Sequence, residues 1–200
     1  MVDGVIPPES QQKYLDIILF ETDRLTKLTS NLLDVNNFDK DNIFLDISHF
    51  NLHDSIRKTA GALEGVAAKK DIHFDLELSD TEPLWVSGDK DKIQQVLHNL
   101  MDNAVKFSHE GSSILISTRE KGNRVFVSVK DSGIGIPKDD LGKIFERFYK
   151  TDLSRGKDKL GTGLGLSICK EIITAHKQNL DVVSTEGVGS EFVFTLTKET

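Results

Sequence analysis

The sequence feature that most constrains the fold is an apolar repeat between residues 93 and 107. Apolar side chains recur there at steps of three and four: Ile93, Val96, Leu97, Leu100, Met101, Ala104 and Phe107. This spacing gathers them on one face of an α-helix. The segment is therefore predicted to be an amphipathic helix whose apolar face packs on a core.

The other side of this predicted helix carries an unusual set of polar groups. Asn99, Asn103 and Lys106 fall on one line, with Asp102 at its edge. A face that only needs solubility is usually built from Glu and Lys pairs, whereas amide oxygens beside a lone cation suit a hydrated Mg²⁺ ion and a phosphate. These residues alone leave two interpretations open: a magnesium and phosphate site, or a helix that happens to carry two asparagines.

The composition is that of an ordinary globular protein with an acidic balance. The chain has 200 residues, 38% of them hydrophobic, and a formal net charge of −7. Non-specific binding to nucleic acid depends on clustered Lys and Arg, so no nucleic-acid partner is expected. The single cysteine, Cys169, excludes an intramolecular disulfide and favours a reducing compartment. No apolar run approaches the ~20 residues of a membrane span, and a cytoplasmic location is expected.

Four segments are predicted along the chain. Residues 1–8 have no periodicity and look like a leader or a loop, and the polar residues 38–42 form a linker. Between them, residues 9–37 show a helical pattern with apolar residues spaced by sevens. Such a helix needs an apolar partner, either the following domain or a helical bundle with another chain. The main domain is expected over residues 43–200.

Within the main domain, strand and helix patterns follow one another. Strands are predicted at 44–50, 72–78, 84–86, 113–119, 124–130, 180–184 and 191–197. Besides the helix that ends at Phe107, helices are predicted at 52–69, with Asn51 as its cap, at 141–149 and at 163–177. This order predicts an α+β fold, a two-layer α/β sandwich whose helices cover one face of the sheet. Residues 137–160 are long, charged and glycine-containing, which indicates a mobile functional loop.

The first of three glycine clusters follows a predicted strand. Asp131 stands at the strand end, and Gly133 and Gly135 follow it. Glycine lets a flat ring approach the backbone closely, and an ionised Asp can accept a hydrogen bond from an exocyclic amine. Taken alone, this cluster is better explained as a turn with a surface Asp.

The second cluster, residues 161–166, runs straight into a predicted helix. Free backbone amides at a helix start make an anion site. The spacing differs from the dinucleotide pattern G-x-G-x-x-G, and the chain has no phosphate-loop pattern G-x-x-x-x-G-K-[ST]. A flexible helix entry is the alternative, which is less attractive because three glycines in five residues carry an entropic cost. The third cluster, residues 187–190, is by itself simply a turn.

In combination, these motifs resemble the catalytic ATP-binding domain of bacterial sensor histidine kinases, in the GHKL superfamily. Residues 98–107 resemble the N box, 131–135 the G1 box, 144–149 the F box, 161–166 the G2 box and 187–192 the last glycine box. The likeness covers about residues 43–197, and residues 9–37 resemble the second helix of the dimerisation bundle. DNA gyrase, heat-shock chaperone and mismatch-repair ATPases share the superfamily, but the F and G2 boxes favour the kinases.

The resemblance implies ATP and Mg²⁺ as cofactors. Asn99 and Asn103 would hold Mg²⁺, Lys106 would contact phosphate, and Asp131 would receive the adenine amine. Residues 137–160 would form the ATP lid, anchored by Phe145 and Phe148. The remaining implied ATP-binding residues are Phe107, Gly133, Gly135, Ile136, Arg147, Phe148, Arg155, Gly161, Thr162, Gly163, Leu164, Gly165 and Leu166.

The chain departs from the family at the phosphoryl acceptor. Family members transfer the terminal phosphoryl group to a histidine on the first bundle helix, where an acidic residue follows it. Two of the six histidines, His53 and His109, are followed by an acid here, but no proline follows His53 along its predicted helix and Gly111 interrupts any helical pattern after His109. No catalytic residue is therefore expected on this chain, which resembles a catalytic fragment unable to phosphorylate itself.

The same resemblance implies three partners. They are a first bundle helix that carries the acceptor histidine, a second copy of the full-length protein in a homodimer, and the receiver domain of a response regulator. Two other functions stay open from the sequence. One is a GHKL-type protein-serine kinase, such as an anti-sigma-factor kinase, and the other is a nucleotide-sensing docking module without transfer activity.

Overall fold

The structure is a computed structural model. It describes residues 11–12, 14–18, 22, 29, 44–152 and 161–199. These residues belong to two compact units, within 1–40 and 41–200, which are treated separately. Among the described residues, no helix is both long enough and apolar enough to cross a membrane.

Each described residue of the N-terminal unit is helical. The Gln12 side chain donates to Asp16 Oδ1 at 3.0 Å, and Thr22 Oγ1 donates to the Ile18 carbonyl at 2.8 Å. Both bonds join residues four apart, as a helix places them. Most of the helix predicted over 9–37 lies outside the described residues, as do residues 1–8 and the linker predicted at 38–42.

The second unit is built on one seven-stranded sheet. Its strands are β1 (Ile47–Asn51), β2 (His73–Glu77), β3 (Trp85–Asp89), β4 (Ser113–Lys121), β5 (Arg124–Lys130), β6 (Leu180–Thr185) and β7 (Gly189–Lys198). The order is β1-β3-β7-β5-β4-β2, and β6 also pairs with β7. The pairs are antiparallel except β2 with β4, which is parallel.

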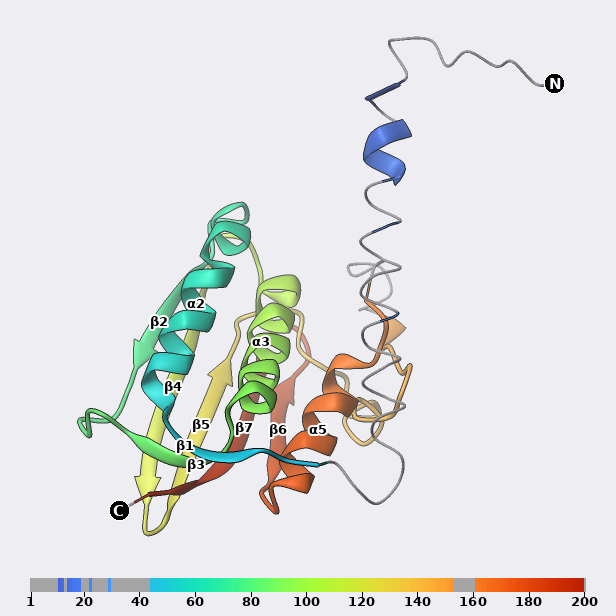
Figure 1. The fold of residues 1–200 in the computed structure, drawn as a ribbon. Helices are drawn as coiled ribbons and strands as arrows, with labels where there is room; N and C mark the ends of the chain where they lie inside the picture. Colours follow the sequence, from blue (N-terminus) through green and yellow to red (C-terminus); the bar gives the residue numbers. More distant parts are fainter. Residues whose placement is uncertain are drawn as a thin grey trace, which may run out of the picture. The chain divides into compact units, whose positions relative to one another are not determined.

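Three helices lie side by side over one face of this sheet (Figure 1). They are α2 (Leu52–Ala68), α3 (Lys90–Phe107) and α5 (Gly165–Ala175). The other face carries no helix among the described residues. The predicted α+β two-layer sandwich is confirmed.

Side-chain caps fix where the first two helices begin. Asn51 Oδ1 accepts the backbone amide of His53 at 3.2 Å, so the predicted cap of α2 is confirmed. Asp89 Oδ1 accepts the amides of Asp91 and Lys92 at 3.1 and 3.0 Å at the start of α3. Each cap satisfies amides that have no partner inside the helix, which typically stabilises it by about 1 kcal/mol.

The apolar repeat of α3 forms the centre of the core. Ile93, Val96, Leu97 and Met101 are fully buried, and Leu100 and Ala104 are nearly so. Burying each large apolar side chain contributes roughly 1.5–3 kcal/mol. At the end of the helix Val105 is buried, whereas Phe107, predicted to lie on the core face, is only half-buried. The middle of α3 is therefore fixed by packing in the core, whereas its last residue is packed less completely.

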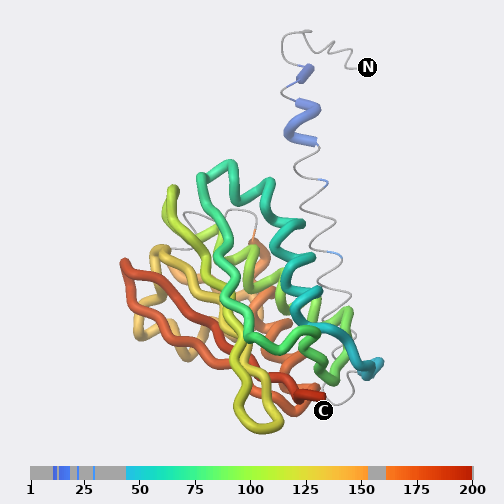
Figure 2. The backbone as a smooth tube through the Cα atoms, turned by 90° about the vertical axis from the view of Figure 1, so that its left-hand side faces the viewer, coloured from blue at the N-terminus to red at the C-terminus, as the bar shows by residue number. Residues whose placement is uncertain are grey.

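The turn between β4 and β5 projects from the unit (Figure 2). Gly122 and Asn123 form it, between the strands that the sequence predicted at 113–119 and 124–130. The Lys198 amide donates to the Asn123 carbonyl at 3.1 Å, so the end of β7 lies against this turn. Val125, Val127 and Val129 of β5 are buried on one face, which agrees with the alternating apolar pattern of the strand predicted at 124–130.

Two predicted features of this unit are wrong. Residues 141–149 form successive turns and no helix, with the Lys143 amide on the Asp140 carbonyl and the Glu146 amide on the Lys143 carbonyl. Gly142 weakens helix formation there, and Phe148 has a positive φ of 64°, which ends any right-handed helix. The strand predicted at 44–50 begins only at Ile47, while the one predicted at 84–86 extends to Asp89.

Candidate functional site

The polar line of α3 faces the beginning of α5. Asn99 Nδ2 donates to the Gly165 carbonyl at 3.4 Å, and a Cβ on Gly165 would stand 3.8 Å from Asn99 Cγ. Asn103 lies one helical turn further on and is half-buried. The structure thus brings the predicted metal ligands beside the second glycine cluster.

The donor set at this line suits magnesium better than a transition metal. Within the described residues, no group of three or more His, Cys, Asp or Glu side chains is placed to hold a metal ion. Mg²⁺ prefers oxygen ligands and keeps several waters, taking its remaining ligands from substrate phosphates. The amide oxygens of Asn99 and Asn103 fit such an ion.

Lys106 is held on the surface of α3 by its neighbour one turn earlier. Its Nζ lies 2.7 Å from Asp102 Oδ2, and both side chains are about one-third exposed. The predicted contact of Lys106 with phosphate stays a prediction. The pair keeps the ammonium on the same side of the helix as the two asparagines.

Asp131 is buried, with 7% of its surface exposed. Its Oδ1 accepts the Ser190 amide at 3.3 Å, and its own amide donates to the Ser190 carbonyl at 2.8 Å. Burial raises the pKa of the carboxyl to about 6, while the amides of Ser190 and Gly133 oppose that rise. The interpretation of this cluster as a turn with a surface Asp is therefore wrong. The Asp131 carboxylate is a desolvated acceptor, of the kind found at binding sites.

The glycines after Asp131 are required by close backbone packing. A Cβ on Gly133 would stand 2.3 Å from the Phe107 carbonyl oxygen, and one on Gly135 would stand 2.0 Å from that of Thr185. Gly135 also has a φ of +65°. The expected reason was access for a flat ring, and the structure adds a different one, because these glycines seat the loop against α3 and β6.

The loop of residues 131–136 is tied to the last hairpin, which the sequence left as a simple turn. The Ile136 amide donates to Ser184 Oγ at 2.9 Å, and the Gly187 amide donates to the Ile134 carbonyl at 2.7 Å. Together with Ser190, these contacts bring the first and third glycine clusters together. Sequence reasoning missed Ser184 and Ser190, and only the position of Ser190 within the last glycine box pointed to it.

The predicted lid is described up to Asp152 and again from Gly161. Arg147, one of the implied ATP-binding residues, pairs with Glu171 of α5. Its Nη2 and Nε lie 2.7 and 3.0 Å from Glu171 Oε1. Phe145 lies under Lys170, whose Nζ is 5.4 Å from the ring centre. Arg155 lies outside the described residues.

Phe148 anchors the lid through its backbone. Its amide donates to the Gly163 carbonyl at 2.9 Å, and a Cβ on Gly163 would stand 2.7 Å from the Phe148 carbonyl carbon. The ring is 60% exposed. The close backbone contact with Gly163, and not burial of the ring, therefore holds Phe148 in place.

The second glycine cluster forms the entry to α5. Thr162 Oγ1 accepts the Leu164 amide at 3.3 Å, and Leu164 is fully buried at the N-cap position. No side chain caps α5 there. Gly161 and Leu166 are half-buried on either side. Uncapped amides at a helix start favour an anion, so this entry suits phosphate.

Two cavities in the described part of the chain lie away from this region. They have volumes of about 440 and 410 Å³ and follow the end of α2 and the edge strand β2. None of the candidate site residues lines either of them. The candidate site is therefore defined by its contacts, which link α3, the Asp131 loop and the start of α5.

A sandwich of this topology with these three linked elements is the ATP-binding domain of a GHKL-type ATPase. Residues 88–200 match the family described as "Histidine kinase-, DNA gyrase B-, and HSP90-like ATPase", and the chain belongs to this family.

Relatives in sequence are sensor kinases. The chain is 36% identical over 188 residues to the sensor histidine kinase WalK of Bacillus subtilis, which covers 92% of this chain and 30% of WalK. It is 35% identical over 209 residues to the sensor protein SrrB of Staphylococcus aureus, covering 99% of this chain and 34% of SrrB. The chain thus spans about a third of the length of these relatives.

Solved structures give the same result. The catalytic domain of the histidine kinase ThkA is 36% identical with a TM-score of 0.67, covering 76% of this chain and 96% of that domain. Full-length ShkA in complex with AMPPNP is 27% identical with a TM-score of 0.82, covering 96% of this chain and 40% of ShkA. ThkA in complex with the response regulator TrrA is 32% identical with a TM-score of 0.77, covering 98% of this chain and 54% of the matched chain.

Proposed function

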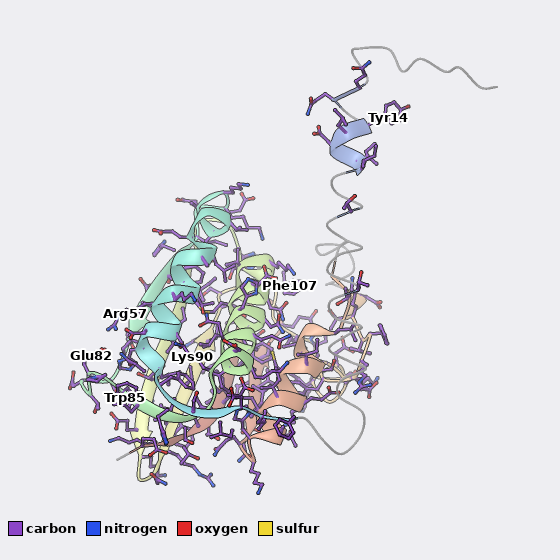
Figure 3. The ribbon with its side chains drawn as sticks, viewed as in Figure 1. Tyr14, Arg57, Glu82, Trp85, Lys90 and Phe107 are labelled. Carbon is purple, nitrogen blue, oxygen red and sulfur yellow. The ribbon has the colours of Figure 1, made fainter. Side chains whose placement is uncertain are left out.

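We propose that this chain is the catalytic region of a sensor histidine kinase, which positions Mg-ATP for phosphoryl transfer to a histidine on another helix. The observation that carries the proposal is the continuous set of contacts across the site. Asn99 of α3 reaches the start of α5, and Gly133 packs on the last residue of α3. Phe107, which ends α3, is labelled in Figure 3. Metal ligands, adenine acceptor and phosphate-binding amides are therefore held as one assembly.

Each part has a distinct task in binding ATP. The Asp131 carboxylate accepts a hydrogen bond from the adenine amine, for which its burial makes it a strong acceptor. Asn99 and Asn103 hold Mg²⁺, which when bound offsets the negative charge of the phosphates. The first amides of α5 and the Lys106 ammonium orient the phosphates. Catalysis by this domain is then positioning and charge neutralisation.

The acceptor imidazole comes from outside the described histidines of this unit. An imidazole nitrogen attacks the terminal phosphorus, the bond to the bridging oxygen breaks, and ADP leaves. His53 and His176 are committed to structure. His53 is fully buried between Glu82 Oε2 at 2.9 Å and Thr118 Oγ1 at 3.0 Å, and His176 Nε2 accepts the Asp89 amide at 2.8 Å.

The surroundings of His53 strengthen that conclusion. Figure 3 shows Glu82 close to Arg57 of α2, whose Nη2 lies 2.8 Å from Glu82 Oε2. The hydrogen bond from Arg57, followed by that from His53, lowers the pKa of Glu82 to about 2. Glu82 is therefore ionised at neutral pH and holds the imidazole in place, so His53 is not available as an acceptor.

The partners follow from the same proposal. The described apolar residues of the N-terminal unit, Tyr14, Leu15, Ile17 and Ile18, are each at least 47% exposed. Helices with such surfaces bury them in bundles, which supports a homodimer of the full-length protein. The histidine kinase ThkA, a structural relative, forms a complex with the response regulator protein TrrA. We therefore propose a receiver domain as the phosphoryl acceptor downstream. A cytoplasmic location is proposed from the single cysteine, which suits a reducing compartment.

Transfer to a supplied bundle tests this function. The chain is incubated with Mg-ATP labelled at the terminal phosphorus and a separately produced bundle helix pair that carries an acceptor histidine. Acid-labile, base-stable label on the bundle and none on this chain is the expected result. Stable phosphohistidine on this chain alone contradicts the proposed acceptor, and binding without transfer would favour the docking-module alternative. The relatives are sensor kinases, so the serine-kinase alternative is not favoured.

A further inference from the structure

The loop that carries Asp131 takes its position from the end of α3. The Ile134 amide donates to the Phe107 carbonyl at 3.2 Å, and the His109 amide donates to the Ser132 carbonyl at 3.2 Å. Residues 108–112, here called the α3–β4 loop, therefore lie beside the Asp131 loop, with a β-bridge between Ser108 and Gly133. These backbone contacts tie the position of the Asp131 loop to the end of α3.

The last turn of α3 lacks the usual glycine cap. Ser108, its C-cap residue, is extended with φ −60° and ψ 153°, and only its amide returns to the helix, on the Ala104 carbonyl. A left-handed glycine normally satisfies the final carbonyls of a helix. The carbonyls of Val105 and Lys106 thus need partners from elsewhere.

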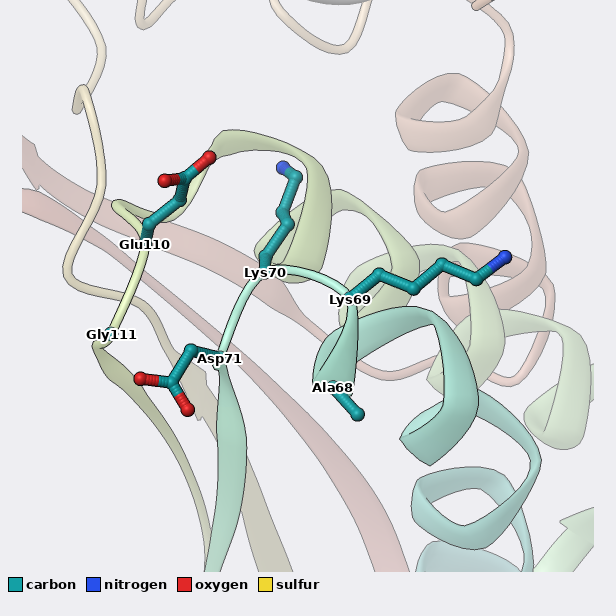
Figure 4. A pocket seen from close by; sticks show the side chains of 6 residues that line it. All are labelled: Ala68, Lys69, Lys70, Asp71, Glu110 and Gly111. Carbon is teal, nitrogen blue, oxygen red and sulfur yellow. The ribbon is translucent and has the colours of Figure 1, made fainter.

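Lys70 supplies these partners from the turn between α2 and β2. Its Nζ donates to the Val105 carbonyl at 2.8 Å and to the Lys106 carbonyl at 2.7 Å. Figure 4 shows the Lys70 side chain rising toward the end of α3, while the neighbouring Lys69 extends another way. A cation at the C-terminal end of a helix is also favoured by the helix dipole.

The same residue holds the far end of the α3–β4 loop. The Lys70 carbonyl accepts the Gly111 amide at 3.1 Å. The loop is thus fixed on one side by Lys70 and contacts the Asp131 loop on the other. Between the described residues, Lys70 reaches the predicted nucleotide site through the backbone carbonyl of Lys106.

We propose that Lys70 is a positioning residue of the nucleotide site, which fixes the last turn of α3 and, through it, the Asp131 loop. The effect on nucleotide rests on the proposed function; the effect on the loop does not. Core burial already fixes the middle of α3, whereas Lys106 and Phe107 at its end are only half-buried. The cap therefore decides the geometry just where the helix meets the adenine acceptor.

The test compares Lys70→Met and Lys70→Arg with the matched control Lys69→Met. Lys69 is the preceding residue on the same turn and is exposed. The first readout is hydrogen exchange of the Ile134 and His109 amides in the nucleotide-free protein, with the Val127 amide of β5 as an internal reference. The second is the calorimetric affinity for a non-hydrolysable ATP analogue.

Lys70→Met is expected to speed exchange at Ile134 and His109 about tenfold, leave Val127 unchanged and weaken affinity about tenfold. Lys70→Arg restores both quantities in part, because the guanidinium can also donate to carbonyls, and Lys69→Met changes neither. Unchanged exchange at both amides in Lys70→Met overturns the proposal. So does equally faster exchange at Val127, which would make Lys70 a general stabiliser. Failure of the unsubstituted protein to bind nucleotide overturns the proposed function, and the exchange data still decide the role of Lys70.

Discussion

Ser190 and Asp131 exchange two hydrogen bonds between the last glycine cluster and the first. The Ser190 amide donates to Asp131 Oδ1 at 3.3 Å, and the Asp131 amide donates to the Ser190 carbonyl at 2.8 Å. The carboxylate is thus held in a buried position with few donors around it. Such an arrangement costs the folded protein stability and leaves an acceptor ready for a ligand.

Asp131→Asn is expected to raise the free energy of unfolding at pH 7.5. The pKa of Asp131 rises from 3.8 to about 6 on folding. Between these values the folded state keeps a proton that the unfolded state has released, so stability falls as pH rises through this window and stays low above it. The shift corresponds to at most about 3 kcal/mol. Urea unfolding at pH 7.5 and pH 4 measures the free energy of unfolding of both proteins. The stability that Asp131→Asn gains over the original protein should be smaller at pH 4.

Asp139→Asn serves as the control for this substitution. Asp139 is exposed and lies on the loop that follows. Its replacement should leave the free energy of unfolding within about 0.5 kcal/mol of the original at both pH values. A variant Asp131→Asn that is less stable than the original protein at pH 7.5 would show that the carboxylate is not under strain.

Nucleotide affinity should itself depend on pH through Asp131. The ionised carboxylate is the better acceptor for the adenine amine, so affinity for adenosine should rise as pH increases through about 6. Below that value it should fall by up to about tenfold per pH unit. Calorimetry between pH 5 and 8 measures the dependence. A flat profile would mean that Asp131 does not contact the base.

Gly133→Ala should damage both the fold and the site. The added Cβ would lie 2.3 Å from the Phe107 carbonyl oxygen, which is backbone and cannot turn away. We expect a loss of about 1–3 kcal/mol of stability and weaker nucleotide binding. Gly142→Ala is the matched control, because nothing lies within 4 Å of its Cβ position. Equal melting temperatures for the two variants would contradict the packing described for the Asp131 loop.

Glu171→Gln should separate binding of the phosphates from binding of the base. Arg147 is held by Glu171 Oε1, and Glu171 Oε2 is buried without a hydrogen-bond partner among the described residues. The pair is partly exposed, so stability should change by less than about 1 kcal/mol. Released Arg147 should raise affinity for an ATP analogue several-fold and leave affinity for adenosine unchanged. Glu146→Gln, at an exposed position in the same segment, is the control, and equal changes for both ligands would exclude this role of Arg147.

Cys169 should be inert to alkylation in the folded protein. It is fully buried in α5, its Sγ lies 3.9 Å from the Val96 carbonyl of α3, and burial raises the pKa of the thiol to about 12. Iodoacetamide attacks the thiolate, so no adduct should form at pH 8 until denaturant is added. Mass spectrometry measures the single adduct, since the chain has one cysteine. Rapid labelling without denaturant would mean that α5 opens away from α3.

The sequence predicted the elements whose pattern is local. The spacing of α3, the cap at Asn51 and the alternation of valines in β5 each follow from neighbours in the chain, and all are confirmed. Contacts between segments that are far apart in the chain leave no such pattern in the sequence, so they were not predicted. The parallel pairing of β2 with β4 depends on α3 lying between them in the chain, and nothing in either strand indicates it.

The site was predictable in its residue types and less so in its geometry. The buried state of Asp131 depends on Ser190, 59 residues away along the chain. The hydrogen bonds from Lys70 to the end of α3 also join residues far apart in the sequence. From the sequence alone, a lysine just after a helix looks like any solvated cation. The helix predicted at 141–149 does not form, because Gly142 and the left-handed backbone of Phe148 outweigh the apolar spacing. The sequence does not reveal the backbone conformation of Phe148.

The most direct test of the central claim is calorimetric titration with a non-hydrolysable ATP analogue, with and without Mg²⁺, for the original chain and two variants. The original chain should bind the analogue more tightly with Mg²⁺. Asn103→Ala should keep the magnesium-free affinity and lose the enhancement, and Asp131→Asn should weaken binding in both conditions. No binding by the folded original chain, or a full magnesium effect in Asn103→Ala, would contradict the account.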